Sequence, residues 1–393
     1  MPDLFERSLM IHEQLDGKIG VVGKMPITSR DDLALVYMPG VARPCEVIAA
    51  DPGKARELTI KGNSVAVVTD GSAVLGMGNI GPHAAIPVME GKAMLFREFA
   101  NIDAWPICID SQQVEEIVAT VRQIAPIFGG INLEDISAPR CFAIESQLQD
   151  IGIPVFHDDQ HGMAIVLIAA VLNAAKVLDR DVAKLRVVIN GAGAAGTAIA
   201  RLLRCVGHSP SKCIAVDDVV VCDSQGVIHS GREDLADYKR ELLAYTNRED
   251  RSGSLRTVLE GADVFIGVSK GNLLSAEDVS TMARDPIVLA MANPIPEFMP
   301  EEAVRGGAAI IGTGRSDFPN QINNLLAFPG NFRGALDAGV PTITEDMKIV
   351  AAKALAAATP APTPDCVLAD PLDREVPRQV AAAVALAAKT HPA

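Results

Sequence analysis

Short apolar runs alternate with longer stretches of helical periodicity between residues 64 and 160. Each apolar run ends at an acidic or glycine-containing turn. Strands that alternate with helices in this way predict a parallel sheet with right-handed crossovers. The predicted strands are 64–69, 104–109, 130–133 and 153–156, and the predicted helices are 84–100, 114–125 and 139–149.

A second alternating series begins near residue 185, after a stretch (163–178) that is apolar on nearly all sides of a helix and is expected to be buried. We therefore expect an α/β protein with two domains. The first domain (1–160) is expected to contain a parallel sheet, and the second (161–393) a Rossmann-type sheet followed by C-terminal helices. In the first domain we also expect a helix at 4–15, a helix start at 29–32 and a loop at 37–44. The other expected strands are 185–189, 218–222, 263–268, 287–292 and 309–312. The other expected helices are 197–206, 238–245, 254–259, 276–283, 321–327, 332–338, 345–358 and 378–389.

Two pairs of adjacent carboxylates follow two of the predicted strands of the first sheet. Their charges repel unless they are neutralised, and a divalent cation is the usual partner. Each pair alone is also compatible with a helix cap or a solvated turn, but together they favour a hard-metal site. Because a ligand site lies at the carboxyl edge of a parallel sheet, one rim is expected to collect Asp70, Asp110, Glu134, Asp135, Asp158 and Asp159.

A glycine-rich sequence follows the predicted strand 185–189 and opens the next helix. This context is typical of a dinucleotide-binding turn. The first glycine permits the tight turn, the second lets the backbone approach a pyrophosphate, and the third allows close helix packing. A glycine turn without a nucleotide is the alternative. The residues of the turn are Gly191, Ala192, Gly193, Ala194, Ala195 and Gly196.

Asp223 ends the next predicted strand, where an acidic side chain can hydrogen-bond the adenosine ribose. It falls later than the usual spacing because residues 207–217 form a long insert. An acid at this point favours NAD over NADP, although the neighbouring Ser224 could still accept a 2′-phosphate.

A lysine and three asparagines are further candidates. Lys92 lies in a mostly apolar helical stretch. It either extends its amine to solvent or is a partly buried base with a lowered pKa. Asn293 follows an apolar strand, and Asn323 and Asn324 precede a turn at 328–330. Their amides suit a carboxylate or carboxamide partner, and as isolated residues they are also typical helix caps.

The 393-residue chain has an ordinary globular composition, with 49% hydrophobic and 21% charged residues. Its net charge of −14 argues against a general binder of nucleic acid or of anionic membranes. We find no secretory signal pattern and no uninterrupted apolar run long enough to span a bilayer. Seven scattered cysteines without zinc-type spacing are interpreted as reduced thiols. These features predict a cytoplasmic protein that binds neither nucleic acid nor a membrane.

Several long segments resemble malic enzymes, in particular the short form found in bacteria. They follow the family's order between about residues 35 and 340. The segments are "VYMPGVARPC", "VVTDGSAVLGMGNIGPHAAIPVMEGKAMLF", "INLEDISAPRCF", "FHDDQHGMA", "GAGAAG", "MANPIPE" and "NQINNLLAFPGNFRGALDAG".

The resemblance implies roles for individual residues. Tyr37 would be the general acid and Lys92 the general base, with Asp158 orienting Lys92. The implied ligands of Mg²⁺ or Mn²⁺ are Glu134, Asp135 and Asp159. The implied contacts to substrate or nicotinamide are Lys92, Asn293 and Asn324, with Asn323 as a neighbouring candidate.

The implied reaction is the oxidative decarboxylation of (S)-malate to pyruvate and CO2 with reduction of NAD or NADP, and the implied assembly is a homodimer or a larger homo-oligomer. Ser230, near where NADP-preferring relatives often carry a lysine, favours NAD. Ala73 replaces a substrate-binding arginine of animal-type relatives, so carboxylate recognition must come from elsewhere. One alternative is a malolactic or oxaloacetate-decarboxylating enzyme without net NADH release. The other is a non-catalytic nucleotide-binding regulator.

Overall fold

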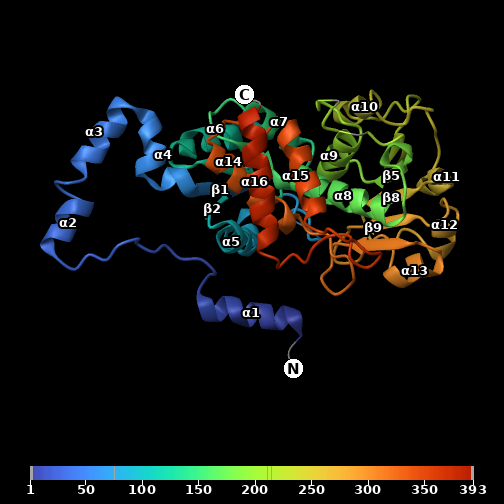
Figure 1. Ribbon diagram of the computed structural model, residues 1–393, viewed down its shortest axis with the longest axis horizontal. Helices are drawn as coiled ribbons and strands as arrows, with labels where there is room; N and C mark the ends of the chain where they lie inside the picture. The colour runs from blue at the N-terminus through green and yellow to red at the C-terminus, as the bar shows by residue number, and fades with distance from the viewer. Residues whose placement is uncertain (1–2, 75, 210, 214, 391–393) are drawn as a thin grey trace.

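Two sheets lie side by side in the computed structural model of the chain, and a helical arm extends from the N-terminal half (Figure 1). The structure describes residues 3–74, 76–209, 211–213 and 215–390. Within these residues the predicted α/β class is confirmed, with strands and helices alternating along most of the chain.

The first sheet has four parallel strands in the order β2-β1-β3-β4. Its strands are β1 (Ser64–Thr69), β2 (Asp103–Cys108), β3 (Gly130–Leu133) and β4 (Val155–His157), and its helices are α5 (Gly81–Ala100), α6 (Val114–Ile124), η3 (Ala125–Ile127) and α7 (Arg140–Gln147). Alternate residues of β1 face two different layers of apolar side chains. Val65 and Val67 belong to the cluster that includes Phe96 of α5, whereas Ala66 and Val68 pack with α6 and α7. Because both faces are covered, all of β1 is buried, which explains its unbroken apolar sequence.

The second sheet has six strands in the order β10-β9-β8-β5-β6-β7. All neighbours are parallel except β6 and β7, which pair antiparallel. Its elements are β5 (Arg186–Asn190), α9 (Ala194–Leu203), β6 (Asp218–Asp223), β7 (Gly226–Val227), α10 (Asp237–Leu242), α11 (Leu255–Leu259), β8 (Val264–Gly267), α12 (Ala276–Ser280), β9 (Ile287–Ala290), α13 (Pro300–Arg305) and β10 (Ile310–Thr313). The short elements β7 and α13 were not predicted.

The helix α8 (Asp158–Val177) connects the two halves, and the short η4 (Val182–Lys184) follows it. α8 begins five residues earlier than predicted, so Asp158 and Asp159 lie in its first turn, where the helix dipole favours negative charge. By length and composition α8 is the one described helix that could cross a membrane, but 72% of its most apolar window is buried inside the protein, as in a core helix.

The C-terminal helices cover parts of both halves. Their bounds are η5 (Asn324–Leu326), α14 (Phe328–Ala338), α15 (Glu345–Ala357) and α16 (Glu375–Thr390). α15 packs on α8, whereas α14 and α16 pack on each other and reach α5. The rings of Phe328 and Phe332 meet Phe96 edge-on, with centroids 4.8 and 5.4 Å apart. The end of the chain therefore lies against the first sheet as well as beside the second.

An N-terminal arm, residues 3–50, extends away from both sheets (Figure 1). It contains α1 (Leu4–Leu15), α2 (Arg30–Val36) and α3 (Ala42–Ala50), none of which has a buried residue. The elements that lead from the arm into β1 are η1 (Pro52–Lys54), α4 (Ala55–Leu58) and η2 (Ile60–Asn63). The loop predicted at 37–44 is wrong at its end, because α3 starts at Ala42 and accepts Pro44 in its first turn.

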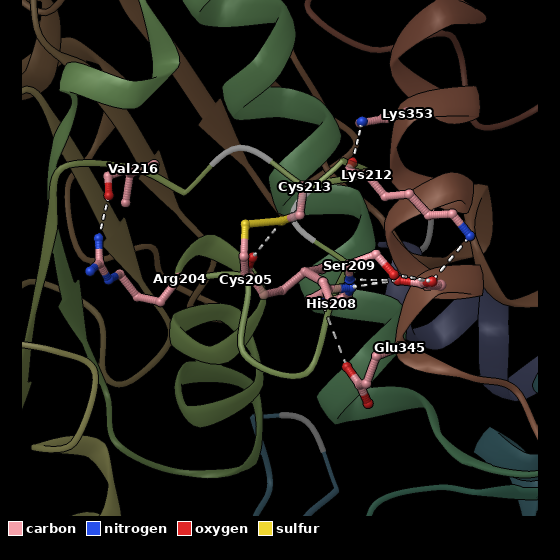
Figure 2. Close-up of a disulfide and its surroundings, with 11 residues drawn as sticks. Arg204, Cys205, His208, Ser209, Lys212, Cys213, Val216, Glu345 and Lys353 are labelled. Carbon is pink, nitrogen blue, oxygen red and sulfur yellow. Dashed lines mark hydrogen bonds and ion pairs between the residues drawn. A yellow bond between two sulfur atoms is a disulfide. The ribbon is translucent and has the colours of Figure 1, made fainter.

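Two other expectations are also wrong. The helix expected at 321–327 is only the single turn η5, because Gln321 pairs with Thr313 of β10 and Asn323 caps the turn. Not all cysteines are free thiols: Cys205 and Cys213 form a disulfide across the insert that follows α9 (Figure 2). Ser209, within this loop, donates hydrogen bonds to Asp346 in the first turn of α15, so the loop is attached to that helix.

Candidate active site

Three carboxylates cluster at the carboxyl edge of the first sheet. One oxygen each from Glu134, Asp135 and Asp159 lies within 4.8 Å of the other two. Burial, together with the charges of Asp159 and Glu134, raises the pKa of Asp135 to about 9. Burial also raises the pKa of Glu134. Three oxygen donors this close fit a hard divalent cation such as Mg²⁺ or Mn²⁺, which would favour their ionised form.

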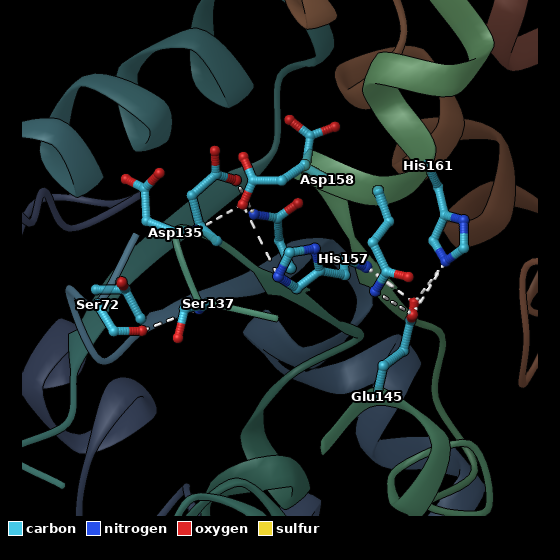
Figure 3. Close-up of polar contacts among 12 residues, drawn as sticks. Ser72, Asp135, Ser137, Glu145, His157, Asp158 and His161 are labelled. Atoms are coloured by element: carbon cyan, nitrogen blue, oxygen red, sulfur yellow. Dashed lines mark hydrogen bonds and ion pairs between the residues drawn. The ribbon is translucent and has the colours of Figure 1, made fainter. Parts of the chain in front are cut away.

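The backbone after β3 explains how two adjacent residues can face one site. The strand ends at Leu133, and Asp135 has a φ of +53°, in the left-handed region. The chain has therefore turned, and the alternation of a regular strand no longer separates the Glu134 and Asp135 side chains. The Asp135 N–H donates to Asp159 Oδ2 over 2.8 Å, which fixes the two ligand-bearing segments to each other. Figure 3 shows Asp135 and Asp158 on neighbouring segments.

The two other acids expected on this rim take no part in the cluster. Asp70 is buried and pairs with Arg140 across 3.1 Å, and its side chain also accepts from the Ser72 N–H. Asp110 follows the edge strand β2 and is exposed to solvent. Both acids follow strands of the parallel sheet and lie on its carboxyl edge as predicted, but the carboxylate cluster is formed by Glu134, Asp135 and Asp159.

Lys92 of α5 lies beside the cluster and is only 7% exposed. Its Nζ donates to Glu134 Oε1 over 2.9 Å, also pairs with Asp158 Oδ2, and lies 3.9 Å from the centre of the Phe328 ring. Burial alone would lower the pKa of Lys92, but the charges of Asp158 and Glu134 outweigh it and raise the pKa above its ordinary value. The expected lowering is therefore wrong for this arrangement, because two carboxylates contact the amine.

Asp158 is completely buried and is held from two sides. Its Oδ2 accepts from Lys92 and, over 2.6 Å, from Asn324 Nδ2 of the C-terminal half. A Cβ added to Gly162, on the next turn of α8, would lie 1.7 Å from Asp158 Oδ1. Gly162 therefore leaves the space that this carboxylate occupies, a requirement that the sequence pattern did not reveal.

The other two asparagines behave differently. Asn323 Oδ1 accepts from the Leu325 N–H over 2.9 Å, so this side chain is a cap. Asn293 Nδ2 donates to the Met291 carbonyl over 3.3 Å. The Asn293 carbonyl oxygen lies 3.1 Å from where a Cβ of Gly76 would be, so the loop after β9 touches a loop of the first half. Of these three asparagines, Asn324 has a direct contact with the group formed by Lys92 and its carboxylate partners, because it donates to Asp158.

The glycine turn has the predicted position, between β5 and α9. Gly191 has a φ of +127°, and a Cβ there would lie 2.6 Å from the Val268 carbonyl oxygen. A Cβ on Gly196 would lie 1.7 Å from the Gly191 carbonyl oxygen, so Gly196 is needed for close packing. A Cβ on Gly193 would meet no atom of the described residues within 4 Å. Open space at the second glycine, at the start of a helix, is suited to a pyrophosphate.

Asp223 ends β6, as predicted, but its carboxylate is already paired. Its two oxygens accept from Arg232 over 2.8 and 3.2 Å, and Lys239 Nζ lies 2.6 Å from Oδ2. Burial raises the pKa of Asp223, but the hydrogen bonds from these bases lower it to about 2. Arg232 and Lys239 were not singled out from the sequence, since both lie beyond the strand that carries Asp223.

Tyr37 stands apart from all these residues. It follows α2 in the N-terminal arm, is 67% exposed, and lies on a segment that projects away from α5 (Figure 1). A single chain therefore does not bring the expected acid to Lys92.

A layer of polar residues behind the carboxylates was also missed. Glu145 of α7 accepts from the His157 N–H over 3.0 Å and from Gln160 Nε2 over 2.9 Å, and His161 Nε2 lies 2.9 Å from it (Figure 3). Burial raises the pKa of Glu145, but His161 and Lys348 lower it to about 2. This largely buried carboxylate is therefore ionised at neutral pH, and its hydrogen bond from the His157 N–H fixes the backbone just before Asp158 and Asp159.

Comparisons with known proteins agree with this arrangement. Residues 16–116 and 111–149 match the malic enzyme N-terminal domain, and residues 160–389 match the malic enzyme NAD binding domain. The chain is 55% identical over 352 residues to an NAD-dependent malic enzyme of Geobacillus stearothermophilus, covering 89% of this chain and 71% of the relative. It is 51% identical over 389 residues to a bifunctional malic/malolactic enzyme of Bacillus subtilis, covering 98% and 93%.

The fold agrees as well. An NAD-dependent malic enzyme of Thermotoga maritima superposes with a TM-score of 0.92 at 45% identity, covering 98% of this chain and 99% of that one. A malic enzyme of Pyrococcus horikoshii gives a TM-score of 0.91 at 44% identity, covering 99% and 91%. With both halves matched and two solved structures that share nearly its whole length, the chain belongs to the malic enzyme family.

Proposed function

We propose that the protein catalyses the oxidative decarboxylation of (S)-malate to pyruvate and CO2, with a divalent cation and NAD(P) as the oxidant. The observation that carries this proposal is the buried Lys92 amine in contact with Glu134 and Asp158, inside a carboxylate cluster that fits a cation. Glu134, Asp135 and Asp159 would hold Mg²⁺ or Mn²⁺, which would act as a Lewis acid towards the hydroxy acid. Lys92 would accept the proton of the malate hydroxyl as C2 is oxidised.

The raised pKa of Lys92 is compatible with this role. Glu134 is one of the two carboxylates that raise it. When Glu134 is engaged in holding a cation, less of its negative charge acts on the amine, and the pKa of Lys92 falls towards the range of a base. Asp158 would then orient the amine, and Asn324 holds Asp158 in place. We expect Lys92→Ala to lose about 10²–10⁴-fold in kcat while still binding nucleotide, and wild-type turnover in this variant would exclude the assignment.

We infer that the general acid Tyr37 reaches the site from a second copy of the chain. The N-terminal arm has no buried residue in its three helices, and it exposes an extended apolar surface. A surface of this kind on a soluble protein marks an interface, and most homo-oligomers are symmetric, so each arm would serve the other copy. The exposed apolar residues around Tyr37 are Leu33, Leu35 and Met38, and those on α5 are Ile86, Val88 and Met94.

Hybrid dimers test this inference. Two differently tagged chains, one with Tyr37→Phe and one with Lys92→Ala, are co-expressed and the doubly tagged dimer is isolated. If the acid is delivered across the dimer, one site of the hybrid is complete, and the hybrid has about half the wild-type rate per dimer. If each site uses its own Tyr37, no site is complete and the hybrid is as inactive as its parents.

We propose NAD as the preferred cofactor, because Asp223 ends β6 where the adenosine ribose is expected. Arg232 and Lys239 beside it provide positive charge that could also accommodate a 2′-phosphate, so some activity with NADP is expected. We also propose that the protein works in the cytoplasm, where soluble pools of malate and NAD(P) are available. The test is NAD(P)H formation from malate with Mn²⁺, with pyruvate and lactate both assayed, since the B. subtilis relative is named for both activities.

A further inference from the structure

A cavity separate from the carboxylate cluster lies between α7, α8, α9, α10 and α15. Its volume is about 710 Å³, within the range of small-molecule sites. Its lining includes neither Lys92, nor the three candidate metal ligands, nor any residue of the glycine turn. The cavity is therefore not part of the malate or nucleotide site described above.

The wall of this cavity offers a cation that has no carboxylate partner among the described residues. Arg201 of α9 lines it and interacts with the Tyr245 side chain. Among the described residues, no carboxylate lies within ion-pair distance of Arg201, whereas the acids on the inner wall are occupied. Glu145 is held by His161 and the His157 backbone, and Glu345 lies 2.6 Å from Lys348 Nζ. Glu241 also lines the cavity but is exposed, so water hydrates its charge.

Aromatic rings lie next to this cation. Phe142 and Tyr238 line the cavity with their ring centroids 5.2 Å apart, and Tyr245 lines it beside Arg201. A guanidinium recognises carboxylates and phosphates through two parallel hydrogen bonds, and ring faces suit a planar apolar group. The combination matches a small organic anion that carries a carboxylate or a phosphate on a planar ring.

Side-chain contacts connect the opposite wall of the cavity to the active site. Lys348 of α15 is 7% exposed, and its Nζ lies 3.4 Å from His161 Nε2. His161 contacts Glu145, which accepts from the backbone N–H of His157, the residue before Asp158 (Figure 3). A ligand that moves Lys348 or His161 therefore acts on the first turn of α8, which carries Asp158 and the candidate metal ligand Asp159.

We propose that this cavity is an effector site for a small organic anion with a planar ring, that Arg201 binds its carboxylate or phosphate, and that occupancy changes malate turnover through Lys348, His161 and Glu145. The binding part stands on the cavity alone. The effect on turnover rests on the proposed function.

Binding is tested first, without substrates, by calorimetry on the full-length protein. The probes are benzoate, phenyl phosphate and inorganic phosphate, with sodium chloride matched for ionic strength. We expect one of the two ring-bearing probes to bind more tightly than inorganic phosphate. Arg201→Gln should weaken it roughly ten- to hundredfold, as expected for the loss of a charged hydrogen-bonded partner. Arg256→Gln, at an exposed arginine outside the cavity, should bind as the wild type does.

Two results would overturn the binding proposal: neither ring-bearing probe binds the wild type, or Arg201→Gln, shown to be folded by its thermal transition, binds equally well. Coupling is tested next by the KM for malate with and without the bound probe. Lys348→Met should bind the probe but no longer show the change in KM, and an unchanged response in this variant would refute the proposed route. If the protein binds the probe but does not oxidise malate, the proposed function fails and the binding site stands.

Discussion

Replacing Gly162 by alanine should inactivate the protein without unfolding it. The new Cβ would lie 1.7 Å from Asp158 Oδ1 and 3.5 Å from the Asn324 Cβ. Real Cβ atoms essentially never approach another atom closer than 3.0 Å, so the carboxylate must move by at least about 1.3 Å. The Asp158 carboxylate cannot move alone, because it accepts hydrogen bonds from both Lys92 and Asn324.

The expected loss follows from this displacement. A shift of about 1 Å in a catalytic group can cost about 10²-fold in rate, so we expect kcat to fall by roughly that factor. Stability should change much less, because alanine is favoured over glycine inside a helix by about 0.5–1 kcal/mol, which offsets part of the strain. The measurements are NADH formation at 340 nm and thermal unfolding by circular dichroism.

Gly91→Ala is the matched control. Gly91 is also a helical glycine and precedes Lys92 directly, but the nearest atom to an added Cβ is Lys18 Nζ at 3.5 Å, an ordinary contact. This variant should keep the wild-type rate. Wild-type kcat in Gly162→Ala would show that the position of Asp158 does not matter for turnover, and the reasoning would fail.

Three further predictions concern cofactor choice, acid stability and metal binding. Asp223→Ser should release Lys239 and one side of Arg232, which stays paired with Asp234. Their positive charge then faces a 2′-phosphate, so the ratio of kcat/KM for NADP over NAD should rise roughly ten- to hundredfold; an unchanged ratio would exclude this role. Because the pKa of Glu145 is lowered to about 2 from 4.5, its stabilising contribution is complete above about pH 4.5 and is lost as the pH falls towards 2. Glu145→Gln should therefore lower the midpoint of urea unfolding at pH 7 and flatten its decline in that window, and an equally steep decline would contradict the assignment. Since the pKa of Asp135 is raised to about 9 without a cation, cation binding at neutral pH must displace a proton. Calorimetry should show Mn²⁺ affinity rising up to tenfold per pH unit and levelling off near pH 9, whereas a flat profile between pH 7 and 9 would disagree.

The acidic residues that gather at the carboxyl edge of the first sheet could be predicted from the sequence. Glu134, Asp135 and Asp159 meet because parallel strands end on one side of their sheet, a rule that needs no knowledge of packing. The glycine turn was equally accessible, since its strand-to-helix context is local. Periodicity also located most of the longer helices and strands, with errors mainly at their ends, but it missed α3, α4, β7 and α13.

Contacts between distant segments could not be predicted in the same way. Asn324 meets Asp158 across 166 positions, and Lys348 approaches His161 across 187. No local pattern encodes such pairs, because they depend on how the C-terminal helices return to α8. The role of Gly162 likewise depends on where the Asp158 side chain lies and not on backbone conformation.

The N-terminal arm shows a different limit of prediction from the sequence. Two of its helices, α1 and α2, were predicted from local signals such as the helix-start pattern at residues 29–32, whereas α3 was not predicted. The surface on which these helices pack was not predicted. Lys18 of the arm contacts Glu90 and Pro87 of α5, but none of the three arm helices has a buried residue. The disulfide between Cys205 and Cys213 depends similarly on the shape of an irregular insert, for which cysteine spacing gives no rule.

The most direct test of the account is absorbance at 340 nm with purified protein, (S)-malate and Mn²⁺, in parallel with NAD and NADP, followed by assays of pyruvate and lactate. We predict that reduced cofactor forms in equal amount to pyruvate, faster as NADH from NAD than as NADPH from NADP, and that chelation of the metal abolishes the signal. Consumption of malate to lactate without NADH, or no consumption of malate at all, would contradict the proposed reaction.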